Sequence, residues 1–259
     1  MKVLVLNSGS SSIKFQLFRR DDWSVAASGA VSRIGEAEAE LRCQWTDSEG
    51  QVQTVEERDA MPDHHTGLER IARRLARTGM LVDASELLAV GHRVVHGGAH
   101  LHAPTWLDAG VIAELASLTP LAPLHQPPAL HAVQALLAQA PACPQLAAFD
   151  TAFHAHLPEV NRHYALPARV RDAGVVRYGF HGIAYASVAA QLARMAPDLA
   201  AGKVVAAHLG SGASVCAMRG GVSEHTSLGF STLDGLPMST RSGALDPGVL
   251  LHLMSEEGL

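Results

Sequence analysis

The sequence predicts an α/β protein made of two domains related by duplication. The chain has 259 residues, which is enough for two domains of ordinary size. Segments with strand periodicity alternate with segments with helical periodicity, an order typical of α/β folds. Residues 2–10 also resemble residues 203–211, which suggests one copy of a common unit in each domain. We therefore expect a first domain over residues 1–150 and a second over residues 151–259.

The first elements are two strands joined by a polar turn. Val3 to Leu6 is a short apolar run, and the residues from Asn7 to Ser12 have turn chemistry. Ile13, Phe15 and Leu17 then alternate with polar residues, which is the period of a half-buried strand. Residues 19–62 predict further strands and loops.

Helical and strand-like segments alternate through the rest of the chain. Residues 66–78 predict a helix, because Leu68, Ile71 and Leu75 share one face and Gly79 can cap its end. The remaining elements are expected as strands over 87–95 and 145–149 and as helices over 109–118, 129–140, 184–196 and 248–257.

The repeat also bears on how complete the second domain is. Both copies continue into a serine and a β-branched residue, Ser12-Ile13 and Ser214-Val215, with one residue inserted in the second copy. A large body of chain follows the first copy, but only residues 216–259 follow the second. If the repeat is not a chance match of Gly and Ser, the second domain is incomplete and the chain is truncated at its C-terminal end.

Composition excludes some classes of function. The chain carries 20 Lys and Arg against 25 Asp and Glu, a formal charge of -5, which argues against a nucleic-acid binder. A small anionic substrate is still compatible with this balance. The three cysteines are scattered without a C-x-x-C pair, and no apolar stretch is long enough to span a bilayer. We expect a cytoplasmic protein with reduced thiols and no membrane contact.

Two glycine-containing turns could bind phosphate. Asn7 to Lys14 offers backbone N–H groups, hydroxyls and one lysine, although an ordinary hairpin turn is the alternative. It is not a Walker A loop, because a strand and not a helix follows it. The run from Gly210 to Ser214 lacks the third glycine of a dinucleotide-binding motif, so a second phosphate-binding hairpin fits better.

Three further residues could place a charged side chain beside a ligand. Arg93 lies near the end of one predicted strand and Asp150 directly follows another, at positions where α/β proteins place ligand-binding side chains. Arg241 lies in a tight polar turn, where it could hold a phosphoryl group. The alternatives are a surface salt bridge for Arg93, a turn residue at Asp150 and an incidental arginine at 241. His181 lies between glycines, which would let it approach a ligand closely, or it is an ordinary loop histidine.

The other histidines give weaker evidence of a functional site. His92 and His96 have the i,i+4 spacing of a helical metal site, but the surrounding Val and Gly pairs favour the end of a strand. The remaining ones that we expect on the surface are His64, His65, His100, His102, His154 and His156.

Seven ordered motifs together resemble the acetate kinase family. They are N-S-G-S-S-S-I-K-F at 7–15, H-R-V-V-H-G-G at 92–98, P-L-A-P-L-H at 120–125, F-D-T-A-F-H at 149–154, R-Y-G-F-H-G at 177–182, H-L-G-S-G-A-S-V-C-A at 208–217 and T-R-S-G-A-L-D-P-G at 240–248. The resemblance implies a two-domain actin-like, sugar-kinase-like fold with a duplicated ribonuclease-H-like core. It also implies reversible transfer of the γ-phosphoryl group of ATP to acetate, with Mg²⁺ or Mn²⁺, in a cytoplasmic homodimer.

The resemblance assigns roles to individual residues. Asn7 would help to hold the metal, Arg93 would bind the acetate carboxylate, and His181 and Arg241 would stabilise the phosphoryl group in transfer. Residues that would contact nucleotide phosphates are Lys14, His208, Leu209, Gly210, Ser211 and Gly212. Residues that would line the methyl pocket are Val95, Leu124 and Phe180. Asp150 would be the catalytic carboxylate. Because acetate is already ionised at pH 7, we interpret Asp150 as orienting the metal or Arg93 and not as a base.

Some positions depart from the family pattern. Ser211 stands where the family usually has Asn, Ile183-Ala184-Tyr185 where it has T-S-H, and Thr232 where it has a proline of the acyl pocket. The adenosine-binding glycine motif and a late metal-binding Glu of the family would lie beyond residue 259. A propionate kinase and a non-catalytic phosphate- or partner-binding remnant are therefore the alternatives. A sugar kinase or heat-shock-type ATPase is disfavoured, because Asn7 stands where those proteins have Asp.

Overall fold

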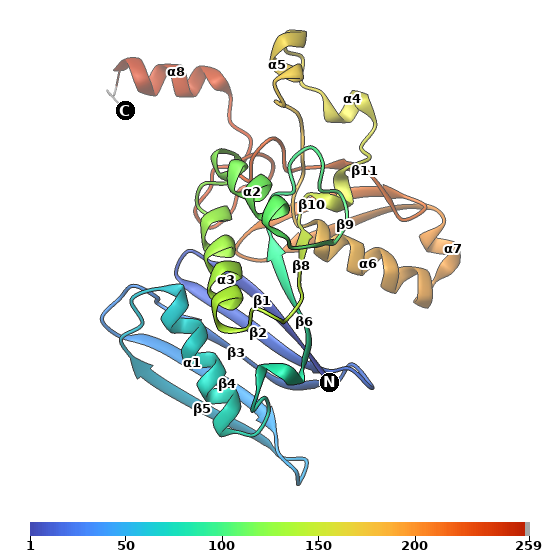
Figure 1. Cartoon of the computed structure of the whole chain (residues 1–259). Helices are drawn as coiled ribbons and strands as arrows, with labels where there is room; N and C mark the ends of the chain where they lie inside the picture. Colours follow the sequence, from blue (N-terminus) through green and yellow to red (C-terminus); the bar gives the residue numbers. More distant parts are fainter. Residues whose placement is uncertain (257–259) are drawn as a thin grey trace. The chain divides into compact units, whose positions relative to one another are not determined.

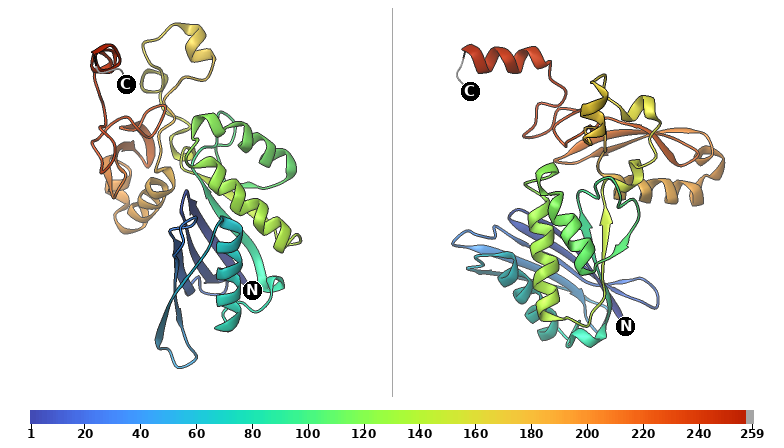
Figure 2. Two further views of the ribbon diagram at one scale, coloured as in Figure 1. Left: turned by 90° about the vertical axis from the view of Figure 1, so that its left-hand side faces the viewer. Right: turned by 45° about the horizontal axis from the view of Figure 1, so that its top comes forward.

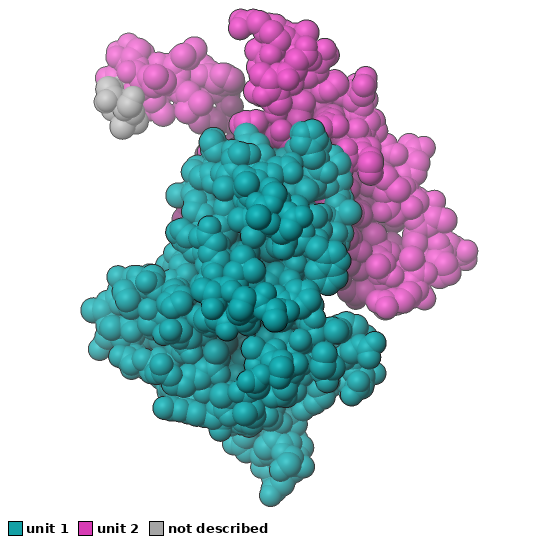
Figure 3. Space-filling model, viewed as in Figure 1, with its two compact units in different colours: residues 1–149 teal, residues 150–259 magenta. Residues whose placement is uncertain are grey.

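The computed structural model describes residues 1–256, and the chain forms two compact units (Figure 1). Unit 1 comprises residues 1–149 and unit 2 comprises residues 150–259 (Figure 3). No helix within residues 1–256 combines the length and the apolar character needed to cross a bilayer.

Unit 1 is built on an eight-stranded mixed sheet with the order β5-β4-β3-β2-β1-β6-β8-β7. β1 to β5 form an antiparallel meander, while β6 runs parallel to β1 and β8 runs parallel to β6. The strands are β1 (Lys2–Gly9), β2 (Ser12–Arg19), β3 (Val25–Ser32), β4 (Ala39–Thr46), β5 (Val52–Asp59), β6 (Leu87–Val94), β7 (Thr105–Trp106) and β8 (Gln145–Phe149). Because β6 and β8 are parallel neighbours, their C-terminal ends lie at the same end of the sheet, and Arg93 is the penultimate residue of β6.

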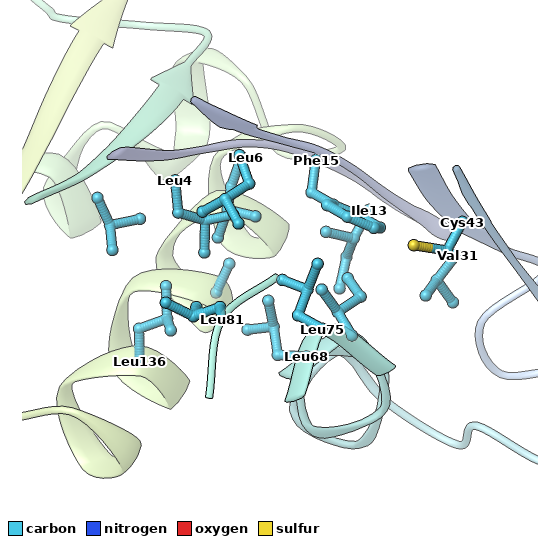
Figure 4. Close-up of a cluster of buried hydrophobic side chains, with 14 of the residues drawn as sticks. Leu4, Leu6, Ile13, Phe15, Val31, Cys43, Leu68, Leu75, Leu81 and Leu136 are labelled. Atoms are coloured by element: carbon cyan, nitrogen blue, oxygen red, sulfur yellow. The ribbon is translucent and has the colours of Figure 1, made fainter. Parts of the chain in front are cut away.

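Helices cover one face of this sheet. The helices of unit 1 are α1 (His64–Arg77), α2 (Ala109–Ser117) and α3 (Gln126–Gln139), with short 3₁₀ turns at Ala84–Glu86 and Thr119–Leu121. α1 and α3 lie on the same side of the strands (Figure 2). Leu68 and Leu75 of α1 and Leu136 of α3 pack against Leu4 and Ile13 of the sheet, in a cluster that forms the core of unit 1 (Figure 4).

Unit 2 contains a three-stranded antiparallel sheet with the order β11-β10-β9. Its strands are β9 (Lys203–Leu209), β10 (Ala213–Arg219) and β11 (Val222–Thr226). Its helices are α4 (Glu159–Arg162), α5 (Ala168–Asp172), α6 (Gly182–Met195), α7 (Pro197–Ala200) and α8 (Pro247–Glu256), with a 3₁₀ turn at Ala152–His154. Tyr185 of α6 packs with Cys216 and Met218 of β10 in a small buried cluster.

The internal repeat corresponds to two similar hairpins. In unit 1, Gly9 pairs with Ser12, so the turn consists of Ser10 and Ser11. In unit 2, Leu209 pairs with Ala213, so the turn consists of residues 210–212. The turn of the second hairpin is therefore one residue longer than the turn of the first.

Some local expectations were wrong. α3 begins at Gln126 and not at 129, because its two prolines lie in the first turn, where a missing N–H costs nothing. β11 and the short helices of unit 2 were not expected. His64 and His154 are buried and not on the surface, because each makes hydrogen bonds inside its unit. The helix expected over 248–257 is α8, and residue 257 lies outside the described residues.

Candidate functional site

In unit 1, the predicted ligand-binding residues Asn7, Lys14 and Arg93 lie at the turn end of the β1–β2 hairpin. Asn7 and Lys14 are opposite each other in the strand register, and Lys14 is exposed while Ile13 and Phe15 are buried. The Arg93 Nη1 group, at the end of β6, donates a hydrogen bond of 3.0 Å to Asn7 Oδ1. The Arg93 guanidinium, the Asn7 amide and the Lys14 ammonium thus lie at one end of the sheet.

A pocket opens on the sheet face that bears Asn7 and Lys14. Its volume is about 400 Å³, and side chains from β1, β2 and β3 line it, including Val5, Gln16 and Ser28. The helices α1 and α3 pack on the opposite face, so this face presents polar side chains to a ligand.

His64 is a residue of this region that the sequence analysis missed. It belongs to the first turn of α1, and its Nε2 lies 2.7 Å from the carbonyl oxygen of Gly9. A carbonyl only accepts, so Nε2 carries the proton and donates it. His64 therefore ties the glycine turn of the β1–β2 hairpin to α1. A histidine just after the N-cap residue Asp63 was the available signal, but nothing in the sequence placed it beside Gly9.

His92 and His96 lie in and just after the last residues of β6 and not on a helix. His92 is buried with Nε2 2.7 Å from Gln145 Oε1, and burial lowers its pKa to about 4 despite that hydrogen bond. Burial also lowers the pKa of His96 to about 4, and its Nδ1 accepts a hydrogen bond from Gly98 N. Within the described residues, no group of three or more His, Cys, Asp or Glu side chains could hold a metal ion. The preference for a strand end is confirmed.

In unit 2, Asp150 and His181 are linked through the start of α6. Asp150 follows β8 and is buried, and its carbonyl oxygen accepts a hydrogen bond of 2.8 Å from Gly182 N. A Cβ on Gly182 would lie only 2.3 Å from that oxygen, so glycine is required there. His181 adopts the left-handed conformation, with φ 61° and ψ 18°, as the N-cap of α6. Few non-glycine residues adopt this backbone conformation, which is enriched at functional sites.

His181, the turn of the second hairpin and Arg241 lie together. A Cβ on Gly212 would be 3.2 Å from His181 Nε2 and 4.0 Å from Arg241 Nη1. The rings of His181 and His208 stack with their centroids 4.2 Å apart. His181 Nε2 and Arg241 Nη1 can therefore both donate hydrogen bonds beside Gly212, which has no side chain to fill the space next to them.

Backbone groups hold Arg241 in place. Its Nη1 donates 2.9 Å to the carbonyl of Thr232, and Ser239 Oγ donates 3.3 Å to the carbonyl of Ser211. The first contact holds Arg241 within its own loop, and the second links that loop to the turn of the second hairpin. Arg177 has a supporting role that the sequence analysis did not assign, because its guanidinium donates to the carbonyls of Thr226 and Leu228.

The residues of the expected methyl pocket differ in burial. Val95 is buried and Leu124 is exposed, both in unit 1. Phe180, in unit 2, is buried, and its carbonyl accepts a hydrogen bond of 3.1 Å from His154 Nε2. His154 Nδ1 lies 2.8 Å from Ser223 Oγ, and burial lowers the pKa of His154 to about 4. The pocket assignment stays a prediction.

The fold and these side chains define a class of protein. It is an α/β protein with a duplicated strand–turn–strand unit, in which arginine, lysine and histidine donors surround glycine-containing turns. Such turns and donors suit anionic groups, phosphate above all. The chain belongs to the Acetokinase family, whose sequence pattern matches residues 2–259.

Individual relatives agree with this assignment. The chain is 44% identical over 260 residues to an acetate kinase of Nitrobacter hamburgensis, covering 99% of this chain and 63% of the relative. It is 46% identical over 267 residues to an acetate kinase of Methylocella silvestris, covering 98% and 64%. The chain therefore spans less than two thirds of the length of these relatives.

Solved structures confirm the fold class. The crystal structure of Porphyromonas gingivalis acetate kinase matches with a TM-score of 0.87 at 39% identity, covering all of this chain and 65% of that one. A propionate kinase from Francisella tularensis matches with a TM-score of 0.90 at 30% identity, again over 65% of its chain. The chain has the actin-like α/β fold of these kinases, and it corresponds to 65% of the length of each solved chain.

Proposed function

We propose that this chain takes part in reversible, ATP-dependent phosphorylation of acetate to acetyl phosphate. The observation that carries the proposal is the match to the Acetokinase family along the whole chain, together with the clustering of His181, the 210–212 turn and Arg241. Transfer to a carboxylate needs charge neutralisation and positioning, because the acceptor is already ionised at pH 7.

Arg93 is the proposed partner of the acetate carboxylate. Its planar guanidinium suits a carboxylate, and its hydrogen bond to Asn7 holds the side chain at the end of β6. Val95, Leu124 and Phe180 are the proposed wall around the methyl group. The preference for acetate over propionate belongs to the proposal, and it is tested in the experiment below.

Arg241 and His181 are the proposed donors to the phosphoryl group in transfer. Both lie beside Gly212, where a side chain would fill the space that an anionic oxygen needs. Lys14 and the run from His208 to Gly212 are the proposed contacts to nucleotide phosphates. A well-placed arginine contributes on the order of 10³ to 10⁵ in rate to phosphoryl transfer.

The donor chemistry of Asn7 and Asp150 fits Mg²⁺. Mg²⁺ in phosphoryl-transfer sites is typically held by one or two carboxylates, water and substrate phosphates, and not by a dedicated protein cage. The Asn7 amide oxygen accepts from Arg93 but has a second lone pair. Mg²⁺ or Mn²⁺, when bound, would neutralise phosphate charge. Asp150 is the proposed group that orients it. A homodimer and a cytoplasmic location are further parts of the proposal.

The test is acyl-phosphate formation trapped with hydroxylamine. The 259-residue chain is assayed with Mg-ATP and acetate, with propionate in parallel. A chimera is assayed beside it, in which the chain is continued by the C-terminal part of the Nitrobacter hamburgensis relative. We expect product with acetate in excess of propionate, in the chimera at least. A folded chimera that forms no acyl phosphate would contradict the proposal, and an excess with propionate would reassign the acceptor.

A further inference from the structure

Ser214 forms a buried link between His181 and Tyr185. Its Oγ lies 2.8 Å from His181 Nδ1 and 2.6 Å from Tyr185 Oη. Ser214 is 0% exposed and Tyr185 is 1% exposed, so solvent does not reach either hydroxyl. These are the two side-chain partners of Ser214 in the described part of the chain.

Counting protons fixes the direction of both hydrogen bonds. Ser214 and Tyr185 each have one hydroxyl proton, and within the described residues the Tyr185 hydroxyl has Ser214 as its side-chain partner. If Ser214 donated to Tyr185, the Tyr185 proton would have no acceptor. If His181 Nδ1 and Tyr185 both donated to Ser214, the Ser214 proton would have none. Every donor is satisfied only if Tyr185 donates to Ser214 and Ser214 donates to His181 Nδ1.

The energetic difference between these arrangements is large enough to matter. A buried hydroxyl left without an acceptor loses a hydrogen bond that water cannot replace, so the satisfied arrangement dominates by about fivefold to a hundredfold. In that arrangement Nδ1 of His181 accepts, so the neutral ring carries its proton on Nε2.

We propose that Ser214 and Tyr185 are positioning residues that hold His181 as its Nε2–H tautomer, with this donor turned toward the 210–212 turn. The orientation follows from the position of Nε2 beside Gly212. The value of this tautomer rests on the proposed function. An Nε2–H group stabilises an oxygen of the phosphoryl group, whereas the other tautomer would present a lone pair to an anion.

Unit 2 contains an internal control for this arrangement. His154 also has a buried serine, Ser223, 2.8 Å from its Nδ1. Its Nε2 faces the carbonyl of Phe180 at 3.1 Å, and a carbonyl can only accept. His154 must therefore be an Nε2–H tautomer, so its ring nitrogens supply the reference pattern for His181.

The first test needs no substitution. Nitrogen NMR of the ¹⁵N-histidine-labelled 259-residue chain at pH 7 distinguishes the two neutral tautomers of each ring. We expect His181 to show the same Nε2–H pattern as His154. An Nδ1–H pattern at His181, or an even mixture of both tautomers, would overturn the proposal whether or not the chain is active.

Substitutions then separate the two positioning residues. Ser214→Ala should convert His181 to a mixture of tautomers, while Tyr185→Phe should keep Nε2–H, because Ser214 still has only Nδ1 to donate to. Ser223→Ala is the matched control: His181 should be unaffected, and His154 should keep its Nε2–H form, because the carbonyl of Phe180 still accepts from its Nε2. An unchanged His181 spectrum in Ser214→Ala would contradict the proposal.

Kinetics connect the tautomer to turnover. In the form that makes acyl phosphate, Ser214→Ala should lower kcat in proportion to the loss of the Nε2–H form, about twofold for an even mixture, with little change in the KM for acetate. A loss confined to KM would overturn the positioning role. If no form of the protein makes acyl phosphate, the proposed function fails, and the NMR result still decides the tautomer.

Discussion

The β1–β2 hairpin of unit 1 and the β9–β10 hairpin of unit 2 share a sequence pattern but are supported differently. β1 pairs with β2 on one side and β6 on the other, whereas in the described part of the chain β9 pairs only with β10. Leu4 of β1 is 5% exposed, and Val205, its counterpart in the repeat, is 72% exposed. A local pattern thus fixes the strand–turn–strand unit, while the neighbouring elements determine how much it stabilises the fold.

Helices also cover opposite faces of the two hairpins. In β1 the buried side chains are Leu4, Leu6 and Ser8, on the face that α1 and α3 cover. In β9 the better-covered positions are Val204, Ala206 and His208, whose counterparts in the repeat lie on the open face of unit 1. The open face presents Asn7 and Lys14 in unit 1. In unit 2 the corresponding hydrogen-bond donors are His181 and Arg241, which lie beside the turn at 210–212.

The largest expected effect concerns the chemistry of unit 2. Arg241→Ala should lower acyl-phosphate formation by about 10³-fold or more, because the proposed charge stabilisation is lost. Its free energy of unfolding should change little. Arg219→Ala, which removes an exposed arginine of the same unit, is the matched control and should keep its rate. Equal rates for the two variants would refute the role of Arg241.

The next effect compares equivalent positions in the two hairpins. Leu4→Ala should lower the free energy of unfolding by about 2–5 kcal/mol, since it leaves a cavity in the core of unit 1. Val205→Ala should change it by less than about 0.5 kcal/mol, because that side chain is already in solvent. Urea unfolding of both variants measures the difference. Similar losses at both positions would contradict the difference in support between β1 and β9.

Acid should weaken unit 1 through His92. Its pKa is about 4 in the folded chain because of burial, against about 6.5 when unfolded. Between these values the unfolded state binds the extra proton, so stability falls as the pH falls from 6.5 toward 4. From pH 7 to pH 5 the loss is about 2 kcal/mol for this one residue. In urea unfolding, His92→Gln should lose correspondingly less free energy of unfolding between pH 7 and pH 5 than the unchanged chain. Equal losses in the two proteins would show that His92 is not the cause.

The smallest effect compares two helix caps. Asp63 accepts a hydrogen bond of 2.8 Å from Thr66 N at the start of α1, and Asp246 accepts one of 2.8 Å from Gly248 N at the start of α8. Asp63→Ala should destabilise the chain by about 1 kcal/mol. Asp246→Ala should not affect global unfolding, because none of the described side chains of α8 is buried. Thermal unfolding of both variants separates these outcomes.

Much of the fold followed from periodicity. The apolar alternation of β2 and the shared face of Leu68, Ile71 and Leu75 in α1 predicted those elements and their buried sides correctly. The left-handed backbone of His181 and the close packing at Gly182 were not predictable, because they depend on contact with the turn at Asp150.

The candidate site could be predicted only as a list of residues. Sequence motifs named Asn7, Arg93, His181 and Arg241, but not the hydrogen bonds that orient them. His64 and His154 were placed on the surface because a lone histidine carries no periodic signal. Ser214 and Tyr185 lie 29 positions apart in the chain, so only the packing of α6 on β10 reveals that they meet.

Hydrogen exchange of backbone amides tests the central comparison most directly. The 259-residue chain is exchanged at neutral pH, and the amides of β1 are compared with those of β9. We expect β1 to exchange only with the global unfolding of unit 1 and β9 to exchange at least about a hundredfold faster, through local opening. Equal protection of the two strands would contradict the account, because it would mean that β9 is as well supported as β1.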